Sequence, residues 1–294
     1  MTSEVSGATS PSIDEQLAES WLATLESNAS FDAPWVQEAV AWLADDGRPG
    51  SVLDVGCGAG GAAAAFARAL PAATVVATDR DPRLLAVARG RAAAGGVADR
   101  IRWLATTIDA LALPDRSVEL AWASGVVHHT ADQQATVYAL ARLVRPGGRL
   151  VLVEGGLPLR CLPHEIGLGR PGLESRLDEA RSRWFVDMRA ELGGPPLPYG
   201  WPETLARAGL AGVRSRSFLA ELVPPLGELG RQIVEQHLTS ALTDLEHRLD
   251  KDDRATLARL LDPDDTAYMG RRDDLVVTAA RTVHVGTAPG APLS

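Results

Sequence analysis

Short apolar runs alternate with amphipathic stretches through the first half of the chain. The apolar runs have the length of buried β-strands and are dominated by Val, Leu and Ala. The stretches between them carry apolar residues at helical spacing and begin or end at Pro or Gly. Strands that alternate with helices predict a parallel sheet with helices on both faces. Strands are expected over 51–55, 74–79, 101–106, 118–124 and 149–155.

The pattern changes after residue 156. Loops rich in Gly and Pro separate amphipathic stretches that predict long helices over 173–192 and 225–261. Two further strands, over 213–222 and 274–285, are expected to complete the sheet as an antiparallel pair. We therefore predict an α/β fold with a Rossmann-like, doubly wound, seven-stranded and mostly parallel sheet that carries helical cap insertions.

Two helices are expected before the first strand, over 14–27 and 34–47, with Pro34 in the first position of the second. No internal sequence repeat is evident. The expected organisation is a disordered N-terminus (1–13), N-terminal helices that form a lid (14–47), a Rossmann-like core (48–156), a cap insertion (157–200), a continuation of the core (201–223), a helical cap insertion (224–270), the final core strand (271–286) and a disordered tail (287–294).

A glycine-rich bend, GCGAGG, follows the first expected strand. Ligands of open α/β sheets bind at the carboxyl ends of the strands, which is where this bend lies. Gly56, Gly58 and Gly61 have the spacing of dinucleotide-binding proteins, with Asp79 about twenty residues further on, which makes a nicotinamide-dependent oxidoreductase one reading. The glycines could also serve only to turn the chain. Asp54 argues against a dinucleotide, because a carboxylate repels a pyrophosphate and attracts a cationic cofactor.

Five stretches resemble, in order and spacing, the class I S-adenosylmethionine-dependent methyltransferases. The cap segment over 154–178 is similar to a group of actinobacterial methyltransferases of small-molecule type. The resemblance implies S-adenosyl-L-methionine as the cofactor and methyl transfer to O or N of a small organic acceptor, a secondary metabolite. A methyltransferase acting on a peptide or protein residue, or the oxidoreductase, is the alternative. The matching stretches are VLDVGCGAG (52–60), VVATDRDPRLLAVAR (75–89), LALPDRSVELAWA (111–123), VVHHTAD (126–132) and LVRPGGRLVLVEG (143–155).

The resemblance also implies which residues bind the cofactor. Its amino-acid end would be held by Asp54 and the glycine-rich bend, and its ribose hydroxyls by the two oxygens of Asp79. An acid after the third strand often binds the adenine amine in this family. Thr107 stands at that position here, which is a departure, and Asp109 is the alternative. The implied cofactor-binding residues are Asp54, Gly56, Cys57, Gly58, Asp79, Arg80, Thr107, Ile108 and Ser124.

Methyl transfer mainly requires alignment, but a hydroxyl or ammonium acceptor also needs a base, and an imidazole suits this task near neutral pH. His128 and His129 follow the fourth strand, where they either act on the acceptor or only bond the backbone. Glu154 ends the fifth strand, and His164 lies in a loop that can fold over the cleft. The catalytic candidates are His128, His129, His164 and Glu154.

Aromatic residues of the cap are candidates for the wall of an acceptor pocket, or else pack the cap against the sheet. The candidates are Trp184, Tyr199 and Trp201, with Phe185 beside the first.

The amino-acid composition indicates which kinds of binding partner are unexpected. The formal charge is -9 and no cluster of Lys and Arg occurs, which speaks against a nucleic acid partner. The two cysteines lack metal-ligand spacing, so free thiols and no metal are expected. The start of the chain lacks the features of a secretory signal, and no apolar run reaches the ~18 residues that span a bilayer. We expect a cytoplasmic monomer or homodimer with no membrane partner.

Overall fold

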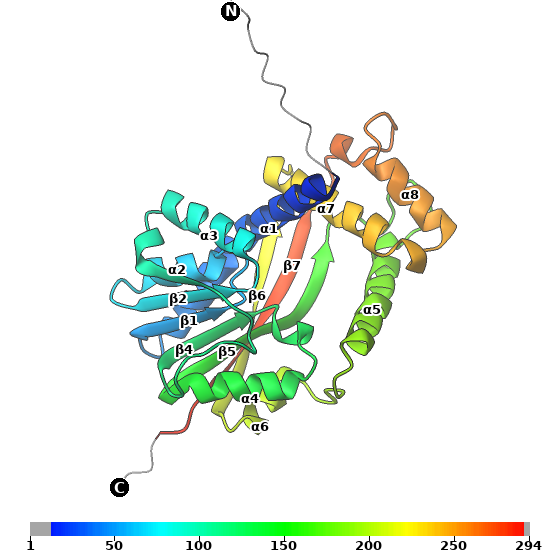
Figure 1. The fold of residues 1–294 in the computed structure, drawn as a ribbon. Helices are drawn as coiled ribbons and strands as arrows, with labels where there is room; N and C mark the ends of the chain where they lie inside the picture. The colour runs from blue at the N-terminus through cyan, green and yellow to red at the C-terminus, as the bar shows by residue number, and fades with distance from the viewer. Residues whose placement is uncertain (1–12, 291–294) are drawn as a thin grey trace, which may run out of the picture.

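The computed structural model describes the backbone of residues 13–290 and the side chains of residues 24–290. One seven-stranded sheet lies between two layers of helices, and a group of helices extends from one side of it (Figure 1). The expected disordered stretch 1–13 lies outside the described residues except for its last position. The tail was expected to be disordered from 287 on, but Ala288 is buried and exchanges hydrogen bonds with Gly147 and Gly148.

The strand order is β3-β2-β1-β4-β5-β7-β6, and β7 runs antiparallel to both of its neighbours. The pairings among β1 to β5 are parallel. This topology confirms the predicted fold class. The strands are β1 (Ser51–Val55), β2 (Thr74–Asp79), β3 (Ile101–Ala105), β4 (Val118–Ser124), β5 (Val144–Arg160), β6 (Ala211–Leu222) and β7 (Val277–Thr287).

Strand β5 is much longer than the predicted 149–155. It begins directly after the preceding helix because Val144 already pairs with Val118 of β4. Gly148 then lies so close to β4 that a Cβ atom there would be 2.7 Å from the Glu119 carbonyl oxygen. It continues to Arg160 because it stays paired with β7 beyond a bulge at Gly156. The extension carries the chain away from the sheet and into the cap.

Helices cover both faces of the sheet. On one face lie α1 (Ile13–Ala44), α2 (Gly61–Ala69) and α3 (Pro82–Ala94), and on the other lie α4 (Gln133–Leu143) and α6 (Trp201–Arg207) (Figure 1). Side chains of β1 alternate between the two cores, since Val52 packs with the α1 side and Leu53 with the α4 side. Short 3-10 turns are η1 (Ala98–Arg100), η2 (Val127–His129), η3 (Glu246–Arg248) and η4 (Met269–Arg271).

The prediction of two N-terminal helices is wrong, because α1 runs unbroken through Pro34. Proline removes one backbone donor inside a helix, which normally favours a break. Here the apolar face continues across it, with Phe31, Trp35 and Leu43 all buried. Packing of this face against α2, β6 and α7 offsets the lost hydrogen bond.

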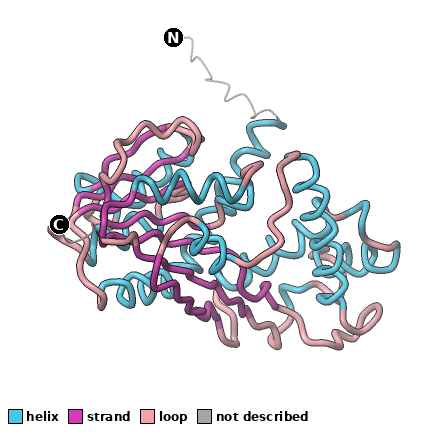
Figure 2. The backbone as a smooth tube through the Cα atoms, turned by 90° about the horizontal axis from the view of Figure 1, so that it is seen from below, coloured by secondary structure: helices cyan, strands magenta, loops and turns pink. Residues whose placement is uncertain are grey.

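The cap consists of α5 (Leu173–Leu192), α7 (Glu228–Asp244) and α8 (Lys251–Leu261) with their connecting loops. Figure 2 shows these helices gathered to one side of the strands. The helix predicted over 225–261 is in fact two helices, because Asp250 caps α8 by accepting a hydrogen bond from the Asp253 amide at 2.9 Å. Among the helices of the described part of the chain, none is long and apolar enough to cross a membrane.

Candidate cofactor-binding and active site

Two acidic side chains are buried where β1 and β2 end. Asp54 is 1 % exposed and accepts a hydrogen bond of 2.9 Å from the Ala63 amide in the first turn of α2. Asp79 is also buried and accepts hydrogen bonds from the amides of Gly58, at 2.9 Å, and Asp81, at 3.0 Å. The ion pairs of the described residues include neither carboxylate. The strand ends therefore carry negative charge that no side chain compensates.

Burial is the main cause that raises the pKa of Asp54, to about 7. The charge of Asp79 acts in the same direction, whereas the hydrogen bond from Ala63 acts against it. A cationic group bound between the strand ends would favour the ionised form of Asp54. A pyrophosphate would be repelled there, which disfavours a dinucleotide.

The glycine-rich bend connects these acids. Gly56 has φ 64°, and a Cβ atom there would lie 2.4 Å from Val126 Cγ2, so this glycine lets the bend approach the turn after β4. Gly58 also has positive φ, at 52°, but a Cβ atom there would meet nothing within 4 Å. The space above Gly58 is open, as close approach of a ligand to the backbone requires. The Cys57 amide donates to the Thr78 carbonyl at 2.8 Å and ties the bend to β2.

The residues expected near an adenine ring lie at the ends of β2 and β3. Arg80, Thr107 and Asp109 are exposed, whereas Ile108 is half-buried and packs on the α4 side of the core. The Thr107 hydroxyl accepts a hydrogen bond from the Ala110 amide at 3.3 Å. The assignment of the adenine contact to Thr107 or Asp109 stays a prediction.

Glu154 organises the turn that follows β4. Its side chain is buried, and Oε1 accepts hydrogen bonds from the amides of Val126, at 3.1 Å, and Val127, at 2.9 Å. Its other oxygen, Oε2, lies 2.7 Å from Nδ1 of His128. Both oxygens of Glu154 therefore contact the turn or the imidazole, and its role as a base stays a prediction.

The His128 ring is oriented by this contact. Donation from Nδ1 to the carboxylate leaves Nε2 as the basic nitrogen. The side chain is 24 % exposed, so the ring is partly accessible from outside. The His129 ring lies 4.0 Å away between centroids, and partial burial together with His128 lowers the pKa of His129. Ser124, at the end of β4, is half-buried just before this turn.

The C-terminal half of α5 lies against the same turn. Arg189 donates to the carbonyl oxygens of His128 and Ala131 at 3.0 Å each, and to that of Thr130. Phe185, one helical turn earlier, places its ring 5.9 Å from the His128 ring. Arg189 could not be identified from the sequence, because its position in the last turn of a helix gives no indication of its partners.

Other predicted residues are placed elsewhere. His164 is exposed in the cap loop, where its carbonyl accepts from the Gly172 amide at 2.7 Å, and within the described chain no hydrogen bond or ring contact joins it to His128. Trp184 is half-buried against the cap core. Tyr199 donates to Gln134 of α4 at 3.0 Å, and Trp201 packs on the α4 side of the sheet. A role of these three aromatic residues in an acceptor pocket stays a prediction.

Comparison with known proteins decides whether the glycine-rich bend belongs to a dinucleotide-binding protein or to a methyltransferase. Residues 52–148 match a family model described as a methyltransferase domain. These residues belong to the class I S-adenosylmethionine-dependent methyltransferases. The match covers the strand ends and the turn just described, and it confirms the resemblance found in the sequence. Proteins of this family use S-adenosyl-L-methionine, so the predicted cofactor is confirmed as well.

Curated relatives of this methyltransferase domain match over the same part of the chain. Methyltransferase GfsG of Streptomyces halstedii is 39% identical over 105 residues, which are 35% of this chain and 37% of the relative. Demethylmenaquinone methyltransferase of Thermus thermophilus is 34% identical over 123 residues, 42% of this chain and 54% of the relative. The chain thus spans about a third to a half of the length of these relatives.

A solved structure extends the likeness in fold beyond the methyltransferase domain. A candidate type II methyltransferase from Anaeromyxobacter dehalogenans superimposes with a TM-score of 0.55 at 19% identity, covering 87% of this chain and 97% of that one. At this identity the likeness concerns the fold alone.

The residues at the strand ends fit the family's cofactor. S-adenosyl-L-methionine carries positive charge on its ammonium and sulfonium groups, which the uncompensated carboxylates of Asp54 and Asp79 would attract. The open space above Gly58 leaves room for close approach to the backbone.

Proposed function

We propose that the protein is an S-adenosylmethionine-dependent methyltransferase that methylates O or N of a small organic acceptor, a secondary metabolite, with His128 as the general base. The observation that carries the proposal is the contact between His128 Nδ1 and Glu154 Oε2 at the end of β4. It supports a base whose free nitrogen faces the site and whose other nitrogen is held by a buried carboxylate.

The cofactor would be held by the strand ends. Asp54 provides charge for the ammonium end, and the bend from Gly56 to Gly58 provides backbone contacts. Asp79 provides two acceptor oxygens for the ribose hydroxyls. Its present hydrogen bonds from Gly58 and Asp81 already hold the carboxylate in a fixed orientation. When bound, the cofactor supplies an electrophilic methyl group on a neutral leaving group, so that the protein mainly has to align the acceptor.

The proton of the acceptor is the part of the reaction that needs a residue of this chain. His128 Nε2 would take the proton from the acceptor oxygen or nitrogen, while Nδ1 keeps its own hydrogen on Glu154. The ring is then a cation, and the buried carboxylate of Glu154 stabilises it. Glu154 is a positioning residue in this scheme, because its oxygens contact the turn and the imidazole.

The contacts of the cap favour a small acceptor over a peptide. Phe185 lies against the His128 ring, and Arg189 holds α5 on the turn, so a helix covers one side of the base. A covered base suits an acceptor that is enclosed and shielded from water. An exposed peptide segment would need this helix to move aside.

A screen of candidate acceptors with methyl-labelled cofactor tests the proposal. We expect release of S-adenosylhomocysteine and label in a small hydroxyl- or amine-bearing compound, and both should be lost in His128→Ala. Calorimetry should detect micromolar binding of S-adenosylhomocysteine and none of NADH. Preferential binding of NADH would reject the methyltransferase assignment, and label transferred only to peptides or proteins would reject the small acceptor.

A further inference from the structure

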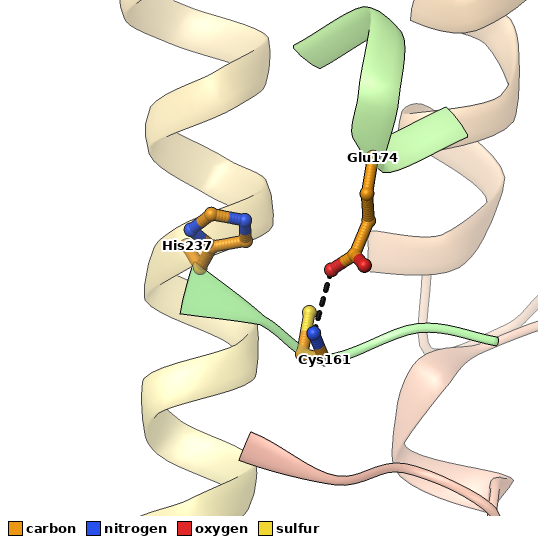
Figure 3. A group of neighbouring side chains, drawn as sticks. All are labelled: Cys161, Glu174 and His237. Carbon is orange, nitrogen blue, oxygen red and sulfur yellow. Dashed lines mark hydrogen bonds between the residues drawn. The ribbon is translucent and has the colours of Figure 1, made fainter. Parts of the chain in front are cut away.

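A thiol, a carboxylate and an imidazole meet inside the cap, away from the residues placed in the active site. Cys161 follows the end of β5, Glu174 lies in the first turn of α5, and His237 lies in the middle of α7 (Figure 3). One ligand atom from each side chain lies within 4.8 Å of the other two. Cys161 and Glu174 are buried, and His237 is half-buried. The end of β5 and the helices α5 and α7 thus bring a sulfur, an oxygen and a nitrogen donor close together.

The Cys161 thiol bonds to the Glu174 side chain, and a metal ion would replace the thiol proton in this contact. Within the described chain, neither ring nitrogen of His237 has a hydrogen-bond partner, although the ring is half-buried. Glu174 Oε1 accepts from the Cys161 amide at 2.6 Å and the Leu162 amide at 3.2 Å, which fixes the carboxylate. The nearest cation to Glu174 Oε2 is Arg160 Nε at 3.9 Å, and the Arg160 guanidinium is itself paired with Asp178.

We propose that Cys161, Glu174 and His237 bind a zinc ion that ties the end of β5 to α5 and α7. Zinc accepts sulfur, nitrogen and oxygen ligands together, usually in tetrahedral geometry with bonds of about 2.0–2.3 Å. That geometry places ligand atoms roughly 3.3–3.8 Å apart, so the side chains would need to close in only slightly from their present separation. Magnesium and calcium are poorer candidates, because they prefer six or more oxygen ligands.

The charges of the site also suit a divalent ion. A thiolate and a carboxylate together neutralise the charge of zinc, so that the buried site carries no net charge. Burial and Glu174 raise the pKa of the Cys161 thiol, so the incoming ion must displace its proton, which passes to the buffer. Three protein ligands leave a fourth position of the tetrahedron for water.

The site would stabilise the cap as a unit. Helix α5 carries Glu174 in its first turn and, further along, Phe185 and Arg189, which lie against the His128 turn. An ion that fixes the first turn of α5 therefore also restricts the end that covers the base. The sequence could not indicate this, because 76 residues separate His237 from Cys161 and no short metal-ligand spacing occurs.

Metal binding to the full-length protein tests the proposal. After treatment with a chelator, the protein should bind one equivalent of zinc, with a rise in melting temperature. Cobalt(II) should replace zinc and produce a thiolate-to-cobalt charge-transfer band together with the visible bands of a tetrahedral ion. Cys161→Ser and His237→Gln should each weaken zinc binding by more than about 100-fold, beyond the usual cost of losing an outer-shell partner.

Matched variants separate this site from adventitious binding. Cys57→Ser replaces the only other cysteine, His247→Gln an exposed histidine, and Glu165→Gln an exposed glutamate of the cap loop. All three should keep the zinc affinity and the cobalt bands of the wild type. Zinc binding that survives in Cys161→Ser and His237→Gln would overturn the proposal. If those variants fail to fold, absence of the thiolate band in wild-type protein loaded with cobalt would overturn it as well.

Discussion

His128 Nδ1 lies 2.7 Å from Glu154 Oε2, although the two residues are 26 positions apart, one in the turn after β4 and the other within β5. The other oxygen of the same carboxylate accepts hydrogen bonds from the amides of Val126 and Val127. One buried side chain within β5 therefore holds both the backbone after β4 and the imidazole ring. Such a carboxylate also strengthens the imidazole as a base, because it stabilises the cation that forms.

We expect His128→Ala to lower kcat by about 10²–10⁴-fold, the usual contribution of a general base. Glu154→Gln should lower kcat by less, because a neutral amide can still hold the ring but no longer stabilises its cation. The measurement is turnover at saturating cofactor and acceptor, followed by release of S-adenosylhomocysteine. His129→Ala is the matched control and should retain most activity. Wild-type turnover in a folded His128→Ala protein would make the pair purely structural.

Asp54 should make cofactor affinity depend on pH. Its pKa in the folded protein is about 7, above the usual ~3.9 of an aspartate, so the folded state binds the extra proton between these values. The contribution of this group to the free energy of unfolding is therefore present at low pH and is lost as pH rises through about 7. A cationic ligand binds the ionised form, so its affinity should increase with pH and level off above about 7.

Calorimetry with S-adenosylhomocysteine at a series of pH values measures this dependence. Affinity should fall by about tenfold for each pH unit below 7, as the ionised fraction falls. Asp54→Asn should bind weakly and show no such slope, since an amide does not titrate. An equal slope in Asp54→Asn would assign the pH dependence to a different group.

Asp79→Ala should weaken cofactor binding by about 1.5–3 kcal/mol, the typical loss for hydrogen bonds to a charged group. The expected change follows from the two acceptor oxygens that Asp79 presents at the end of β2. Asp81→Ala is the control, because Asp81 caps α3 through the Arg83 amide and should affect stability rather than binding. Affinity that is unchanged in folded Asp79→Ala would remove this residue from the site.

The arrangement of the strand ends around the glycine-rich bend was predictable, because its signals are local in sequence. Asp54 and Gly56 are two residues apart, and Asp79 ends an apolar run that can only be a buried strand. Strand order then brings these ends together, since parallel strands linked by helices end at one edge of the sheet. The residue types and their order along the chain therefore sufficed.

The acceptor end was not predictable, because its contacts join distant elements. Whether Glu154 acts as a base or holds His128 depends on the distance between two strand ends, which the sequence does not contain. The contact of Arg189 with the turn likewise needs the direction in which α5 crosses the sheet. Pro34 gave a misleading local signal, because burial of the surrounding helical face outweighs one missing hydrogen bond.

The last prediction concerns how α5 is held over the base. Arg189 donates to three carbonyl oxygens of the turn, those of His128, Thr130 and Ala131. Arg189→Ala removes all three bonds, so α5 should loosen from the turn, and the melting temperature should fall. We expect a higher KM for the acceptor and a lower kcat, with cofactor affinity within about twofold of wild type, since the cofactor contacts lie at other strand ends.

Arg189→Lys should show an intermediate defect, because a single ammonium cannot span three carbonyls as the planar guanidinium does. Arg183→Ala is the matched control on the same helix, since Arg183 pairs with Glu179 and the Arg248 carbonyl, away from the turn. It should leave the acceptor KM unchanged. A folded Arg189→Ala protein with weak cofactor binding and a normal acceptor KM would contradict this account, because it would place α5 over the cofactor rather than over the acceptor.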